Sequence, residues 1–370
     1  MIRKVKEVNA LEERQKGLNL GWLSDSRNEI YGLAILWIMV FHGYDWNSID
    51  YSFGLHFLKP LQDFINLGNS GVDMFLLLSG ISLYFSFSRR PETLGFYKKR
   101  YQRLYPPLWI INGFYWFYLF MNDILAKDVM VVKAGGHFVL RMTQLSFWFG
   151  NDRQVWYVAA IAVFYFLYPF LFHFLYDNDR KPAARMWLMM VGVVVVLLSA
   201  RVMYPEMYAK SEIALTRLPI FILGCGMGKL VFERKCVSWW WLALPILLSA
   251  GVVAVGVFDL KVTLKNYALW RYLLSVTGFS MTAFCGVLLH AISWKPLHAF
   301  LRFFGNMSLE LYLAHVTLHH VMLWIVDEKY LCLWQYYVVI AVSIPVAFGV
   351  MKLENALFSK KPKKEGVPAV

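Results

Sequence analysis

Long apolar runs alternate with short polar, mostly basic segments along the whole chain. A membrane-spanning helix needs roughly 20 predominantly apolar residues. Residues 136–149 are apolar but shorter, which is typical of a re-entrant or interfacial helix. Ten stretches approach the required length: 28–46, 64–87, 104–122, 154–176, 186–204, 213–232, 238–258, 267–291, 308–326 and 334–355. The pattern therefore predicts an all-α protein, a polytopic transmembrane bundle of about ten helices.

The same pattern predicts one membrane domain between two polar tails. We expect a cytoplasmic N-terminal tail over 1–29, a membrane domain over 30–356 and a basic cytoplasmic tail over 357–370. Residues 1–29 carry charges of both signs and no apolar stretch before Ile30. We therefore expect no cleaved signal peptide, and the first helix stays as an anchor.

Composition and charge support a membrane protein and indicate its orientation. Hydrophobic residues make up 59%, charged residues 16% and aromatic residues 18% of the 370 residues, against about 25% charged residues in soluble domains. An even number of helices places both termini on one side. If that side is the cytoplasm, its segments hold 25 of the 37 Lys and Arg residues, as the positive-inside rule requires.

The net charge and the cysteine content also limit the kinds of partner and cofactor that we expect. The net charge of +13 belongs to juxtamembrane loops, so we expect the lipid bilayer as a partner and no nucleic acid. The four cysteines are scattered without metal spacing or a disulfide framework, so no metal is expected. A homo-oligomer is compatible with the sequence.

His42 is the first candidate for chemistry. It is the last residue of the apolar segment Gly32–His42. It lies about 12 residues, or ~18 Å, from the inner end of the first predicted helix, which places it past the midplane of the membrane. Imidazole can deprotonate a hydroxyl group at neutral pH. Asp45, three residues later on the same helix face, is a candidate to orient the ring. The alternative is a histidine that only hydrogen-bonds within the bundle.

Arg100 and Arg103 form a basic pair at the inner end of the third predicted helix. They are one turn apart and share a helix face, and guanidinium groups bind phosphates in a bidentate manner. The following Tyr105-Pro106-Pro107 indicates a helix start, where proline is tolerated. The alternative is an ordinary positive-inside anchor.

Other polar residues stand in apolar surroundings that penalise them. Asp73 needs a cation or backbone amides as a partner, while Ser79-Gly80 is a small pair that lets helices approach closely. Glu310 follows the predicted N-cap Ser308, so its simplest interpretation is an anion favoured by the helix dipole.

Two further positions are weaker candidates. His315 and His319 are one turn apart and can touch one ligand, although a metal pair lacks a third ligand. Trp156, at the start of the fourth predicted helix, is typical of an interfacial aromatic belt.

In combination these segments resemble the acyltransferase 3 family of integral-membrane acyltransferases, mainly O-acetyltransferases of surface glycans. The resemblance covers most of the chain and rests on five segments in a fixed order: Gly32–His42, Gly71–Gly80, Arg100–Pro106, Trp156–Pro169 and Ser308–His315. It implies a helical bundle in which His42 is catalytic and Arg100 and Arg103 handle acyl-CoA. One departure is Tyr31, where the family commonly has a basic residue; Arg27 lies one turn before it.

The resemblance implies an acyltransferase of the inner membrane. The expected donor is cytoplasmic acetyl-CoA, and the expected acceptor is a hydroxyl group of a cell-surface or envelope glycan. Two other classes remain as alternatives: a membrane transporter or small-molecule sensor of the same superfamily, and a structural partner of a glycan assembly complex. A transporter is disfavoured because the sequence shows no internal repeat.

Overall fold

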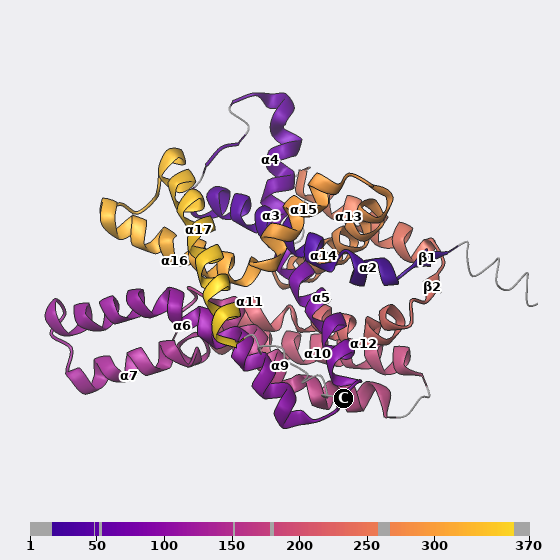
Figure 1. The fold of residues 1–370 in the computed structure, drawn as a ribbon, viewed down its shortest axis with the longest axis horizontal. Coiled ribbons are helices and arrows are strands. Elements are labelled where there is room, and N and C mark those ends of the chain that lie inside the picture. The colour runs from indigo at the N-terminus through magenta and orange to yellow at the C-terminus, as the bar shows by residue number, and fades with distance from the viewer. Residues whose placement is uncertain are drawn as a thin grey trace, which may run out of the picture.

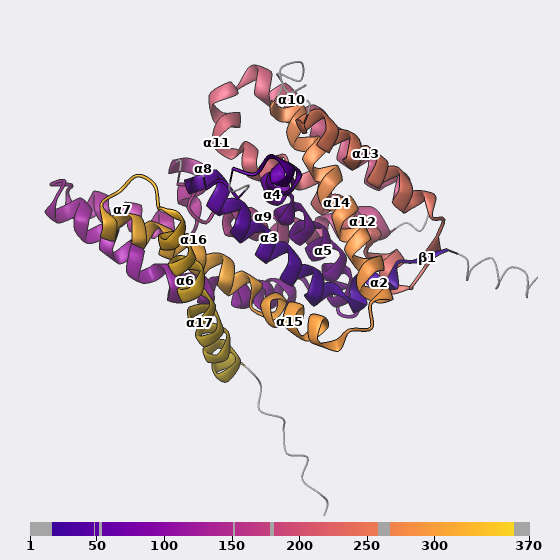
Figure 2. The same cartoon turned by 90° about the horizontal axis from the view of Figure 1, so that it is seen from above.

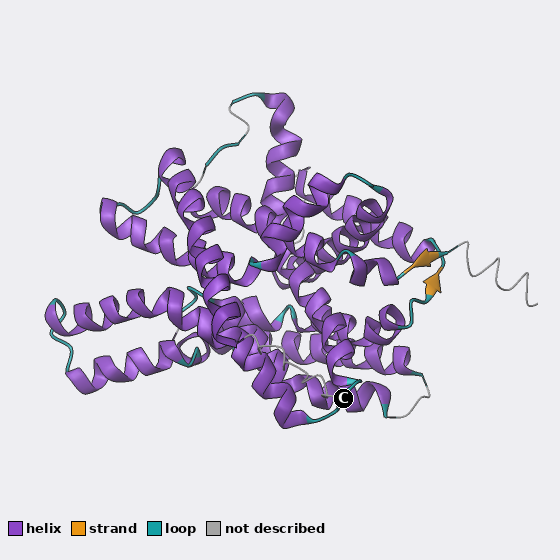
Figure 3. Cartoon of the chain, in the orientation of Figure 1, coloured by secondary structure: helices purple, strands orange, loops and turns teal. Residues whose placement is uncertain are grey.

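The computed structural model describes residues 17–47, 49–51, 54–150, 152–177, 181–257 and 267–358. Nearly all of them are helical, apart from loops and two short antiparallel strands (Figure 3). The elements are β1 (Leu18–Asn19), α2 (Gly21–Asp25), α3 (Arg27–Asn47), η1 (His56–Leu58), α4 (Lys59–Asn66), η2 (Leu67–Asn69), α5 (Ser70–Phe87), α6 (Thr93–Leu125), α7 (Val131–Met142), α8 (Leu145–Gly150), α9 (Trp156–Tyr176), α10 (Pro182–Met203), α11 (Pro205–Leu215), α12 (Leu218–Phe232), β2 (Cys236–Val237), α13 (Trp240–Val257), α14 (Tyr267–Ala291), α15 (Lys295–Asn306), α16 (Ser308–Val326) and α17 (Leu333–Phe358).

The predicted helical membrane bundle is confirmed. Within the described residues, seven helical segments are long and apolar enough to cross a membrane: Lys59–Phe87, Trp156–Tyr176, Pro182–Met203, Pro205–Phe232, Leu274–Ala291, Ser308–Val326 and Leu333–Phe358. The three other expected crossings fall on α3, α6 and α13, so the total of ten remains a prediction. The short apolar stretch 136–149 corresponds to α7 and α8.

One predicted boundary is wrong. α6 begins at Thr93 and continues through Pro106 and Pro107, which the sequence placed at a helix start. The first turns of α6 are polar, so hydropathy alone detects only the later apolar part of the helix. Of the two predicted tails, residues 1–16 and 359–370 lie outside the described residues.

α3 and α5 lie at the centre of the arrangement (Figures 1 and 2). α5 packs against α12 and α14, while α3 packs against α5, α15 and α16. α6 and α7 form a hairpin at one side of the molecule, next to α16 and α17 (Figure 1). This arrangement brings the N-terminal candidates on α3 next to the C-terminal candidates on α16.

Small residues allow a close approach between α5 and α12. A Cβ atom at Gly80 would overlap the backbone at Phe221, and one at Gly224 would overlap the carbonyl group of Leu77. Without a hydrophobic effect between helices in lipid, such close backbone packing is a main source of helix association. The predicted role of Gly80 in close packing is therefore confirmed.

We predict that Gly224→Ala destabilises the bundle by about 1–3 kcal/mol, because the added methyl group must push α12 away from α5. The matched control is Gly192→Ala, because a Cβ atom at Gly192 meets open space. Thermal unfolding of the purified proteins in detergent measures both. An unchanged melting temperature for Gly224→Ala would contradict the close contact.

Candidate active site

Two histidines that are far apart in the sequence meet inside the bundle. His42 lies on α3 and His315 on α16. Nδ1 of His42 is 2.8 Å from Nε2 of His315. Nδ1 of His315 is in turn 2.9 Å from the backbone oxygen of Leu311. The two rings therefore form a short chain of hydrogen bonds that ends on the backbone of α16.

The partners of these rings assign their protons. A backbone oxygen can only accept, so the neutral ring of His315 carries its proton on Nδ1 and presents a lone pair at Nε2. Nδ1 of His42 then donates to that lone pair, which leaves Nε2 of His42 unprotonated. Trp46 stacks on the ring of His42, with centroids 3.6 Å apart. A fixed imidazole with a free Nε2 is suited to act as a general base.

Asp45 does not make the contact that we expected for it. Its side chain is exposed, and its electrostatic neighbour is Arg271. Nδ1 of His42, the atom that a carboxylate would hold, is bonded to His315. Among the described residues it is thus His315, 273 positions away, that orients the ring.

A cavity of about 250 Å³, which we call the central cavity, lies roughly one turn before the histidine pair on both helices. Ile38 of α3 and Tyr312 of α16 contribute to its walls. Three of the residues singled out by the sequence also line it, namely Tyr31, Ser79 and Arg103. The sequence candidates on α3, α5 and α6 thus lie around one cavity.

A second cavity, of about 680 Å³, lies one turn beyond the same pair, and we call it the distal cavity. Trp46 of α3 and His319 of α16 line it, together with polar residues near α7 and α9. α3 and α16 each contribute a residue before the histidine pair to the central cavity and a residue after it to the distal cavity. The pair of His42 and His315 therefore lies between the two cavities.

A third cavity, of about 620 Å³, adjoins the central one, and we call it the vestibule. Arg103 and Asn306 line both spaces, and Lys99, Gln102 and Glu354 line the vestibule. The three spaces therefore follow one another from the polar start of α6 to the far ends of α3 and α16.

Arg103 is held by two carboxylates at the boundary of vestibule and central cavity. It donates a hydrogen bond to Oε1 of Glu310 and another to Oε2 of Glu354, the latter at 2.6 Å. Glu310 lies in the first turn of α16, as expected, and is fully buried. Its ion pair with Arg103 is a further contact that the sequence did not indicate. Glu354 was not among the residues predicted from the sequence, although it stands in a mostly apolar segment, as Asp73 does.

Arg100 does not share the environment of Arg103. Its guanidinium group donates to Oγ of Ser86 and lies 5.4 Å from the ring centroid of Phe96 and 5.9 Å from that of Tyr165. Such stacking stabilises a cation against aromatic faces. The two arginines of the motif thus make separate contacts, even though they lie one turn apart on α6.

Asp73 and Trp156 meet at one buried cluster. Oδ1 of Asp73 accepts a hydrogen bond from Ser275 at 3.0 Å and lies 3.8 Å from Nε of Arg217. The guanidinium carbon of Arg217 is 4.8 Å from the ring centroid of Trp156. Asp73 therefore has a cation partner, one of the two kinds of partner that we expected. Trp156 is half-buried and packs against the same cation.

Tyr31 stands where the resemblance led us to expect a basic residue, and it makes an aromatic contact. Its ring stacks on Phe75, with centroids 5.1 Å apart, in the wall of the central cavity. Nη1 of Arg27 donates to Oγ of Ser82 at 3.3 Å. The cation that could substitute for the missing basic residue is therefore bonded to α5.

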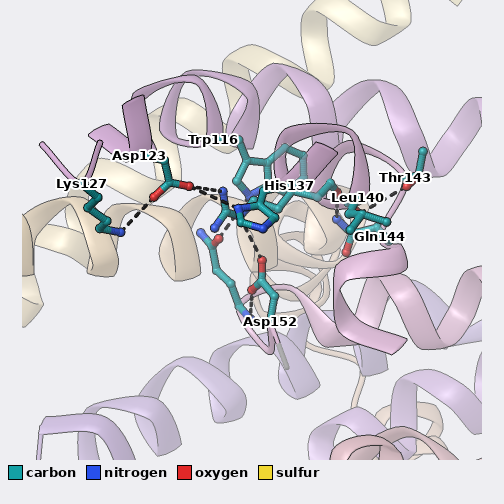
Figure 4. A network of polar contacts seen from close by, with 10 residues as sticks. Trp116, Asp123, Lys127, His137, Leu140, Thr143, Gln144 and Asp152 are labelled. Atoms are coloured by element: carbon teal, nitrogen blue, oxygen red, sulfur yellow. Dashed lines mark hydrogen bonds and ion pairs between the residues drawn. The ribbon is translucent and has the colours of Figure 1, made fainter. Parts of the chain in front are cut away.

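A network of charged side chains braces the hairpin of α6 and α7 beside the distal cavity (Figure 4). Nζ of Lys127 donates to Asp123 at 2.9 Å, which holds the pKa of that carboxyl group below its ordinary value. Arg141 lies 3.9 Å from Asp123 and 3.5 Å from Asp152. Since Arg141 and Asp152 both line the distal cavity, the network fixes one of its walls.

Residues 32–352 match the family model Acyl_transf_3, described as an acyltransferase domain. The chain belongs to the acyltransferase 3 family. The suspected relationship is thus confirmed, and the protein is a multi-pass membrane acyltransferase. No curated protein and no solved structure matches the chain. Across the described residues, no group of three or more His, Cys, Asp or Glu side chains is arranged to hold a metal ion.

We predict that His315→Phe lowers the rate of acyl transfer by about 10²–10⁴-fold, the range of a lost general base, because Nδ1 of His42 loses its acceptor. His315→Gln should retain part of the rate, since its amide oxygen can accept the same bond. Turnover of the acyl donor by protein in nanodiscs measures the rate. His137→Gln is the control, because His137 is partly exposed beside Asp123. Equal rates for His315→Phe and wild type would exclude a positioning role.

Proposed function

We propose that this acyltransferase moves an acetyl group from cytoplasmic acetyl-CoA to a hydroxyl group of an envelope or cell-surface glycan on the other side of the inner membrane. The observation that carries the proposal is the position of the His42–His315 pair between two cavities. A donor and an acceptor can approach such a base from opposite ends of the bundle.

The charge distribution supports the direction of transfer. The vestibule opens among the polar first turns of α6 and the end of α17, close to the segment 88–103 that is rich in Lys and Arg. By the positive-inside rule this end faces the cytoplasm, where acyl-CoA is made. The distal cavity then faces the outer side, where a glycan acceptor resides.

The donor would occupy the vestibule and the central cavity in series. Lys99 and Arg103 supply positive charge for phosphate groups at the larger vestibule. The smaller central cavity, with Tyr31 and Tyr312 in its walls, would hold the chain that carries the thioester. Because Glu310 and Glu354 already neutralise Arg103, a phosphate must compete with one of these carboxylates.

The chemistry would depend on Nε2 of His42. The acceptor hydroxyl loses its proton to this nitrogen while its oxygen attacks the thioester carbonyl carbon. The carbon–sulfur bond breaks, and the leaving thiolate takes up the proton from His42. If the acyl group first bonds to Nε2, the same nitrogen acts as the nucleophile, so both routes need it unprotonated.

We predict that His42→Ala loses acetyl transfer by at least about 10²-fold, the usual lower range for a general base. Protein in nanodiscs receives radiolabelled acetyl-CoA together with envelope polymer extracted from the host, and the label in the polymer is counted. His173→Ala is the matched control, because that histidine is half exposed and hydrogen-bonded to Asp177 at the end of α9. Full labelling by His42→Ala would refute the assignment.

We also predict that both termini are cytoplasmic. Single cysteines at Ser24 and Ser359, in a background without the native four, should resist an impermeant maleimide in intact cells, while one at Ser48 should react. Permeabilised cells provide the control, since both terminal positions should then react. Labelling of either terminus from outside would reverse the proposed donor and acceptor sides.

A further inference from the structure

The distal cavity contains a histidine that the proposed chemistry does not use. His319 lies on α16 one turn beyond His315, lines the distal cavity and is only 5% exposed. Its ring lies next to Trp46, with centroids 4.8 Å apart, and Trp46 also stacks on His42. His319 therefore lies at the acceptor's end of the histidine pair, close to the proposed base.

The neighbours of His319 assign its proton. Asn47 Oδ1 accepts a hydrogen bond from the backbone N–H of Leu331 at 3.3 Å, which identifies this atom as the amide oxygen. Nε2 of His319 lies 3.0 Å from the same oxygen and must therefore be the protonated nitrogen. The lone pair of the neutral ring is consequently on Nδ1.

This lone pair is buried without a partner. Nδ1 of His319 has no hydrogen-bond partner among the residues that the structure describes. A buried acceptor without a donor costs about 1–3 kcal/mol. Because the side chain of His319 lines the distal cavity, a ligand there that donates a hydrogen bond would satisfy it. Nδ1 can only accept, which selects a hydroxyl or amide donor and disfavours a carboxylate or phosphate oxygen.

We propose that Nδ1 of His319 accepts a hydrogen bond from a second hydroxyl group of the acceptor, next to the hydroxyl that reacts at His42. This inference rests on the proposed function and narrows its acceptor to a compound with at least two neighbouring hydroxyl groups. Trp46 and Tyr115 add aromatic faces to the same cavity, as is common in sites for small molecules. Nothing is added to or lost from His319 during the transfer.

The arrangement gives the acceptor an advantage over water. A polyhydroxyl compound can bond to His319 and present another hydroxyl to His42, whereas one water molecule satisfies only one of these positions. Loss of the bond to His319 should therefore lower transfer to the acceptor more than it lowers hydrolysis of the donor. A loss of folding would lower both rates together.

The test measures transfer and thiol release in the same sample. Nanodisc-embedded protein receives radiolabelled acetyl-CoA and envelope polysaccharide extracted from the host. We expect His319→Phe to keep thiol release without acceptor and to lower polymer labelling about tenfold. His319→Gln should retain most labelling, since its amide can donate to Asn47 and also accept. His173→Phe is the remote control, because His173 lies on α9 beside Asp177.

The outcomes separate the two proposals. Equal labelling by His319→Phe and wild type, or a parallel loss of thiol release and labelling, would overturn the role of His319. If the wild type itself releases no thiol or labels no polymer, the proposed function fails instead. In that case, ¹⁵N spectra of histidine-labelled protein, assigned with His319→Gln, still test the assignment. A protonated Nδ1 at His319 would overturn it.

Discussion

The hydrogen bond between His42 and His315 is the interaction on which the functional part of this structure depends. It joins α3 to α16, so it requires the first and the penultimate apolar helices of the domain to lie side by side. It also fixes which nitrogen of His42 is free, because the carbonyl group of Leu311 determines the proton position on His315. A single chain of hydrogen bonds thus links the packing of two helices to the chemical state of one ring.

The polar groups around this pair follow the rule that a charge inside a bilayer needs a partner. Arg103 is bonded to Glu310 and Glu354, and these contacts connect α6, α16 and α17 around the vestibule. Asp73 and Arg217 form the corresponding pair between α5 and the start of α12. Because each charge is compensated by a residue on another helix, these ion pairs specify which helices are neighbours as well as their register.

Glycines allow the helices to come close enough for such pairs to form. α5 and α12 approach at Gly80 and Gly224, and α3 meets α15 at Gly32, where a Cβ atom would overlap the backbone at Leu301. In lipid, this packing replaces the hydrophobic effect as the source of helix association. Where the helices are farther apart, side chains such as Tyr157 and Tyr312 line the central cavity.

The sequence by itself determined the class of the protein, the positions of its helices and most polar residues of the site, because apolar length and the bilayer's penalty for charge are local properties. It also indicated the family, because five motifs of the family occur in this chain in the expected order. Only the tertiary structure decided the pairing: His42 with His315 and not Asp45, Glu310 with Arg103, and the separate contacts of Arg100. Helical periodicity relates residues three or four positions apart on one helix. Contacts between residues more than 200 positions apart depend on how whole helices pack.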